Sequence, residues 1–123
     1  MNEVKRTETI RYFAERMDNC KAIAQQLRGD DREDEAVFAK IRLNIYQIFN
    51  SVFSVALETA GQDDEKVVQF VLSRLQLIPQ GWHAALANAQ QHGETEKAHI
   101  EGIKLDVVAE IKTEFSKIWE VGA

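Results

Sequence analysis

Residues Leu43 to Leu57 read LNIYQIFNSVFSVAL, and this is the most hydrophobic stretch of the 123-residue chain. Its apolar residues recur at intervals of three and four, as they do along one side of an α-helix. Five polar but uncharged residues interrupt it: Asn44, Gln47, Asn50, Ser51 and Ser54. A membrane-spanning helix needs roughly 20 mostly apolar residues. The shorter, interrupted stretch therefore predicts a buried helix in a protein that makes no contact with a membrane.

Three glycines divide the chain into long helical segments. Gly29, Gly61 and Gly93 each follow a segment with helical periodicity, and each precedes an Asp or Thr that can begin the next helix. The pattern predicts helices over residues 3–28, 31–60, 63–79, 81–92 and 95–121. Proline lacks a backbone donor and clashes with the preceding turn, so we expect the third helix to break near Pro79 into two pieces.

Long amphipathic helices joined by short loops bury their apolar faces against one another. We therefore expect an all-α fold: an antiparallel four-helix bundle with up-down-up-down topology, whose third helix is broken near Pro79. The chain length suits one domain. Residues 1–123 are accordingly expected to form a single helical-bundle domain.

The composition argues against several classes of protein. A net charge of −5 argues against a nucleic-acid partner, because surfaces that bind nucleic acid are usually basic. Cys20 is the only cysteine, and no signal-peptide pattern opens the chain, so the expected location is the cytoplasm. The sequence contains no glycine-rich phosphate loop, nucleophile elbow or zinc-binding spacing. We therefore expect no cofactor and no enzymatic activity.

Glu96 and His99 form a Glu-x-x-His motif, the spacing that metal-binding bundles use. A two-metal bundle needs two such motifs and two further inward glutamates, and this chain has one motif. On a helical wheel, His99 lies on the polar side with Asp106, Glu110 and Lys117. The competing interpretation of the motif is an ordinary solvated helix surface.

Trp82 and His83 follow directly on the expected break at Pro79. An aromatic ring beside an imidazole at a kink can line a pocket for a small ligand. The competing interpretation is that Trp82 anchors the core with its indole N–H bonded, and that His83 lies at the surface.

The predicted helix over residues 31–60 carries more apolar surface than one bundle position buries. Its apolar residues cover an arc of about 200°, whereas one face of a bundle helix needs about 100–140°. Spare apolar surface usually marks a contact with a partner, most often a second copy of the chain. The residues that we expect at this interface are Ile45, Tyr46, Phe49, Asn50 and Phe53. The amide and hydroxyl groups of the neighbouring polar strip can fix the register of such a contact. Alternatively, the short helix over residues 81–92 and the chain termini cover this side.

The sequence thus predicts a small acidic helical module for protein–protein interaction. We expect a homodimer that acts as an adaptor or chaperone-like protein, with an amphipathic helix of another protein as a further partner. The alternative is a helical bundle that binds a small ligand or a metal, through Glu96 and His99 or through the kink at Trp82 and His83.

Overall fold

The computed structural model describes residues 3–121, and 89% of these residues are helical, with no strand among them. This confirms the predicted all-α class. The helices are α1 (Glu3–Gly29), α2 (Glu33–Ala60), α3 (Asp64–Leu77), α4 (Gln80–Gln91) and α5 (Thr95–Trp119). Each predicted boundary lies within two residues of the observed one.

The helices α3 and α4 form one bent helix. The axis bends by only 18° at residues 78–79, so the predicted break is not confirmed. The Ile78 N–H still donates to the Arg74 carbonyl, and the Pro79 carbonyl accepts from the N–H groups of Trp82 and His83. Proline removes only its own donor, and Pro79 itself has a right-handed helical backbone. The helix therefore resumes in nearly the same direction, so residues 3–121 contain four helices when α3–α4 is taken as one.

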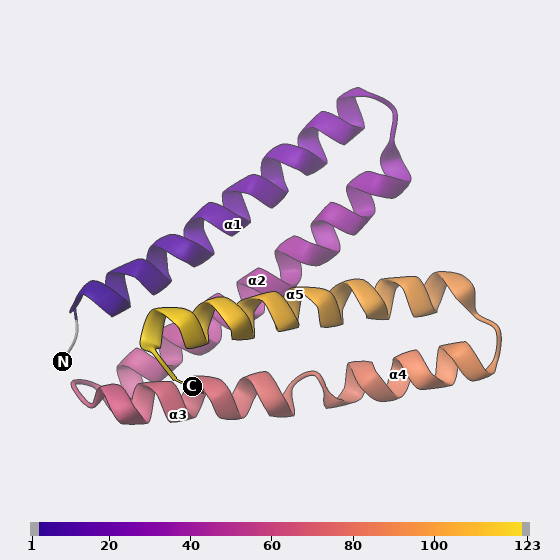
Figure 1. Cartoon of the computed structure of the whole chain (residues 1–123). Coiled ribbons are helices and arrows are strands. Elements are labelled where there is room, and N and C mark those ends of the chain that lie inside the picture. Colours follow the sequence, from indigo (N-terminus) through magenta and orange to yellow (C-terminus); the bar gives the residue numbers. More distant parts are fainter. Residues whose placement is uncertain (1–2, 122–123) are drawn as a thin grey trace.

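Figure 1 shows two hairpins that meet at one end and diverge at the other. One hairpin is α1 with α2, and the second is α3–α4 with α5. The α1–α2 turn lies far from the α4–α5 turn. In the first third of α2, the buried residues are only Ala36 and Ala39. That part of α2 buries little apolar area, and its ring contact with the second hairpin is the edge-on pair of Phe38 and His99.

The core lies where the two hairpins meet, and Phe53 is at its centre. The Phe53 ring lies 6.5 Å from that of Phe13, 6.3 Å from Phe115 and 6.4 Å from Trp119, measured between ring centroids. The Trp119 indole Nε1 donates to the Thr9 hydroxyl at 2.9 Å. The buried Thr9 hydroxyl thus satisfies the indole N–H of Trp119 within the core.

Arg6 ties the start of α1 to the turn between α2 and α3. Its guanidinium donates to Asp64 Oδ1 at 3.0 Å and to the Gly61 carbonyl at 2.6 Å. The Arg6 side chain is only 11% exposed. Gly61 has a φ of +59°, which glycine adopts without a steric penalty. The turn therefore presents its carbonyl to a charged donor at the edge of the core.

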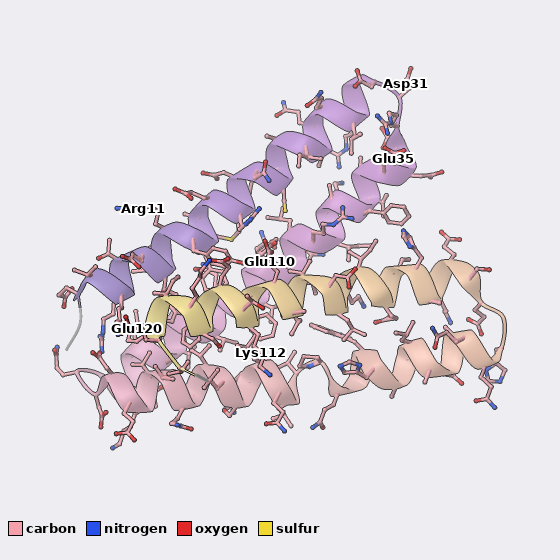
Figure 2. All side chains as sticks on the ribbon, viewed as in Figure 1. Arg11, Asp31, Glu35, Glu110, Lys112 and Glu120 are labelled. Atoms are coloured by element: carbon pink, nitrogen blue, oxygen red, sulfur yellow. The ribbon has the colours of Figure 1, made fainter. Side chains whose placement is uncertain are left out.

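Arg6→Met is expected to lower the free energy of unfolding by about 2 kcal/mol, because hydrogen bonds to charged groups contribute about 1.5–3 kcal/mol. Methionine keeps an apolar side chain of comparable length at this position. Urea denaturation followed by circular dichroism measures the change. Arg11→Met is the control, because Arg11 is exposed and points away from the helices (Figure 2). Equal losses in the two variants would contradict the role assigned to Arg6.

Candidate interaction surface and neighbouring sites

The outward side of α2 carries a surface without charges, which we call the α2 strip. It consists of Asn44, Gln47, Ile48, Ser51, Ser54 and Val55, all of them exposed. Two of these residues are apolar: Ile48 is 37% exposed and Val55 is 45% exposed. The spacing of three and four residues gathers all six on one helix face.

One charged side chain extends this face at each end. Lys40 precedes Asn44 by about one turn, and Glu58 follows Ser54 by about one turn. Both are exposed, and neither takes part in any of the ion pairs of residues 3–121. These two charges are not among the residues predicted for the interface. The signal that identifies them is the spacing of 4, 3, 4, 3 and 4 residues that runs from Lys40 through the strip to Glu58.

Four of the five residues expected at an interface lie in the core of this chain. Ile45, Tyr46, Phe49 and Phe53 are at most 5% exposed, and Asn50 is half-buried. The reason is that α2 packs against three helices, α1, α3 and α5. A helix with three neighbours buries a wide apolar arc within its own chain. The aromatic side of α2 is therefore covered by the chain itself, whereas the α2 strip is exposed.

A polar cluster lies where α1, α2 and α5 meet. The Tyr46 hydroxyl donates to Glu110 Oε2, and Arg16 Nη2 pairs with Glu110 Oε1 at 2.9 Å. The Tyr12 ring lies edge-on to that of Tyr46, with 6.4 Å between centroids. Burial, together with the nearby Glu110 carboxylate, raises the pKa of both tyrosine hydroxyls. The cluster thus joins three helices through two neutral tyrosines and one ion pair.

The helical wheel placed Glu110 on the outward side of its helix, and the structure corrects this. Glu110 is turned toward α1 and α2, and its side chain is 33% exposed. Because α5 has neighbours on more than one side, a position opposite its most apolar stripe still faces another helix.

Glu96 and His99 are exposed near the start of α5. The His99 ring meets the Phe38 ring of α2 edge-on, with 4.8 Å between centroids. Residues 3–121 contain no group of three or more histidine, cysteine or acidic side chains placed to hold a metal ion. The structure thus brings no additional ligand to the Glu-x-x-His motif.

The bend at Pro79 adjoins a cavity of about 490 Å³ between α3–α4 and α5. His83 lines this cavity, and its side chain reaches the surface. Trp82 is not part of the lining. Its half-buried ring lies under the Lys104 ammonium, 5.7 Å from Nζ to the ring centroid. The structure therefore separates the two residues that the sequence placed together at the kink.

Comparisons with protein-family models, with curated proteins and with solved structures find no match. Within residues 3–121, none of the helices combines the length and the apolar character needed to cross a bilayer.

Proposed function

We propose that this protein is a helical interaction module that works as a homodimer, with the α2 strips of two copies facing each other. The observation that carries the proposal is a stretch of roughly three turns of exposed, uncharged helix on a chain whose net charge is −5. Copies of an acidic protein repel each other over most of their surface. The α2 strip lets two copies approach without opposing like charges, and a two-fold dimer uses the same surface twice.

The charges at the ends of the strip favour an antiparallel arrangement. A two-fold axis near Phe49 places position 40 of one copy opposite position 58 of the other, because both lie nine residues from 49. Lys40 then pairs with the partner's Glu58, and this contact occurs twice. A parallel arrangement instead brings Lys40 against Lys40 and Glu58 against Glu58, and opposed like charges cost free energy.

The spacing along α2 suits such a contact. The positions between Lys40 and Glu58 follow a 3.5-residue repeat, the repeat with which two helices stay in contact along a common seam. The seam spans about 27 Å of helix. Its amide and hydroxyl side chains both donate and accept hydrogen bonds, so Asn44 can pair with the partner's Ser54, and Gln47 with the partner's Ser51. Ile48 and Val55 flank the seam, and the contact removes their exposed apolar surface from water.

Molar mass in solution, measured by light scattering after size exclusion, tests the proposal. We expect a mass that rises toward twice the 14.0 kDa of one chain as the protein concentration increases. The measurement is made with and without a reductant, so that a disulfide through Cys20 is not mistaken for the proposed contact. A mass of one chain at every concentration up to about 1 mM contradicts a functional dimer.

Reversing one charge at the end of the strip is expected to weaken the dimer about tenfold or more. Lys40→Glu replaces two attractive pairs with two repulsive ones, and Glu58→Lys does the same with the opposite sign. The double variant Lys40→Glu/Glu58→Lys restores opposite charges and is expected to dimerise like the natural chain. Sedimentation equilibrium at low salt, where surface charges are least screened, measures the dissociation constants.

Lys21→Glu is the matched control, because Lys21 is an exposed lysine that belongs to α1 and not to the α2 strip. It changes the net charge as Lys40→Glu does, and is expected to leave the dimer nearly unchanged. If the double variant is as weak as the single variants, the antiparallel register is wrong. If neither single variant weakens the dimer, the α2 strip is not the interface.

The proposed location of the dimer is the cytoplasm. Cys20 is buried on α1, and burial raises the pKa of its thiol. A buried, protonated thiol is unreactive, which suits a protein held together by a non-covalent contact. Cell fractionation tests the location.

A further inference from the structure

The cavity beside Pro79 is a feature of the second hairpin and does not involve the α2 strip. Its volume of about 490 Å³ lies within the range of roughly 300–1,000 Å³ that is usual for small-molecule pockets. One wall is a single face of α3–α4, which stays continuous because the axis bends by only 18° at Pro79. The other wall is a face of α5, from position 105 to position 112.

The floor of the cavity is apolar. Leu75 and Pro79 of the first wall and Val108 of the second line the cavity, and all three are buried. All three side chains are hydrocarbon and carry no group that can form a hydrogen bond. The floor therefore suits the hydrocarbon part of a ligand and offers nothing to a fully hydrophilic ligand.

The polar side chains that line the cavity are exposed: Lys112 and His83 lie toward opposite ends, and Gln76 lies on α3. Lys112 reaches from α5 toward α3 (Figure 2), is exposed, and takes part in no ion pair among residues 3–121. His83 lies beyond Pro79, toward the α4 end of the cavity. Because α5 runs back along α3–α4 (Figure 1), the ammonium and the imidazole are separated along the groove. The seven steps along α5 from position 105 to position 112 span about 10 Å.

We propose that this cavity binds a small monocarboxylate with an apolar body, of the class of medium-chain fatty acids. The carboxylate pairs with the Lys112 ammonium, because a charge-assisted contact satisfies a cation that forms no ion pair among residues 3–121. The alkyl chain lies along Leu75, Pro79 and Val108. A chain of about eight carbons has roughly the length of this floor.

A titration of the ¹⁵N-labelled full chain with octanoate, followed by NMR, tests the proposal. We expect saturable shifts with one site per chain, concentrated in residues 72–83 and 105–112. Lys112→Met keeps the length of the side chain, removes the charge, and is expected to weaken octanoate binding about tenfold or more. Ala109→Phe fills the cavity from an exposed position of α5 and is expected to abolish binding.

Two controls separate this site from general binding of an amphiphile. Lys117→Met removes another exposed lysine of α5 that does not line the cavity, and octanoate affinity is expected to stay unchanged. 1-Octanol has the same chain without the charge and is expected to bind about tenfold more weakly. The proposal is overturned if no saturable shifts appear up to about 10 mM octanoate. It is also overturned if Lys112→Met and Ala109→Phe bind as well as the natural chain, or if octanol binds as tightly as octanoate.

Discussion

Phe53→Ala is expected to lower the free energy of unfolding by about 3–5 kcal/mol, the usual cost of truncating a fully buried phenylalanine. Phe53 is 1% exposed, and its ring contacts three other aromatic rings from both hairpins. Alanine loses these contacts and leaves a cavity at the point where the hairpins meet. Urea denaturation at a fixed protein concentration measures the change, because dimer formation makes stability depend on concentration.

Val37→Ala is the matched control on the same helix. Val37 is exposed in the part of α2 that precedes the core, and substitution of an exposed residue usually changes stability by less than about 0.5 kcal/mol. The comparison decides between two interpretations of Phe53. If Phe53→Ala costs no more than Val37→Ala, the side chain is not in the core, and the aromatic interface that the sequence suggested is the better description.

Above pH 10, the protein is expected to lose stability steeply as its two tyrosines are forced to ionise. Burial, with the Glu110 carboxylate nearby, raises the pKa of the Tyr12 and Tyr46 hydroxyls above the ordinary value of about 10. The folded chain then binds more protons than the unfolded chain once the pH exceeds about 10. In that range the free energy of unfolding falls by about 1.4 kcal/mol for each unit that the pH rises, for each tyrosine that stays protonated in the folded chain. Below pH 10 this contribution to stability is fully present.

Urea denaturation at a series of pH values between about 9 and 11.5 measures this slope. Tyr46→Phe is expected to remove about half of it, and Tyr12→Phe the other half, because each variant lacks one ionisable hydroxyl. Tyrosinate absorbance gives a second readout, since both tyrosines are expected to ionise only as the chain unfolds. A slope that is unchanged in both phenylalanine variants would show that other groups cause the alkaline loss.

The ends of the helices were predictable because they depend on neighbouring residues. The Asp63 side chain accepts a hydrogen bond from the Lys66 N–H at the start of α3, as its position before a helical segment suggested. Gly61 and Gly93 have positive φ values after α2 and α4, as glycines that follow a helix often do. The effect of Pro79 was not predictable in the same way. Whether a proline separates two helices or only bends one depends on the packing around it.

The candidate interface, too, was predicted in part from the sequence and depended in part on tertiary packing. The sequence identified α2 as the helix with surplus apolar surface and identified its uncharged polar residues. It assigned the aromatic side to a partner, because helical periodicity does not show how many helices surround α2. The polar cluster was also missed, since Tyr46 and Glu110 are separated by 64 residues along the chain.

By itself, the sequence determined the all-α class, the positions of the helices and the residues that lie together on each helix face. These properties follow from backbone geometry, from the glycines after the helices and, for α3, from the Asp63 cap, all of which act within about one turn. Tertiary structure alone decided which faces are covered. In the folded chain three helices pack around α2, and Glu110 faces α1 and α2. The axis of α3–α4 bends by only 18°, and the α2 strip and Lys112 are exposed. The physical reason is that burial depends on contacts between residues far apart in the chain, and these contacts compete for the same apolar surface.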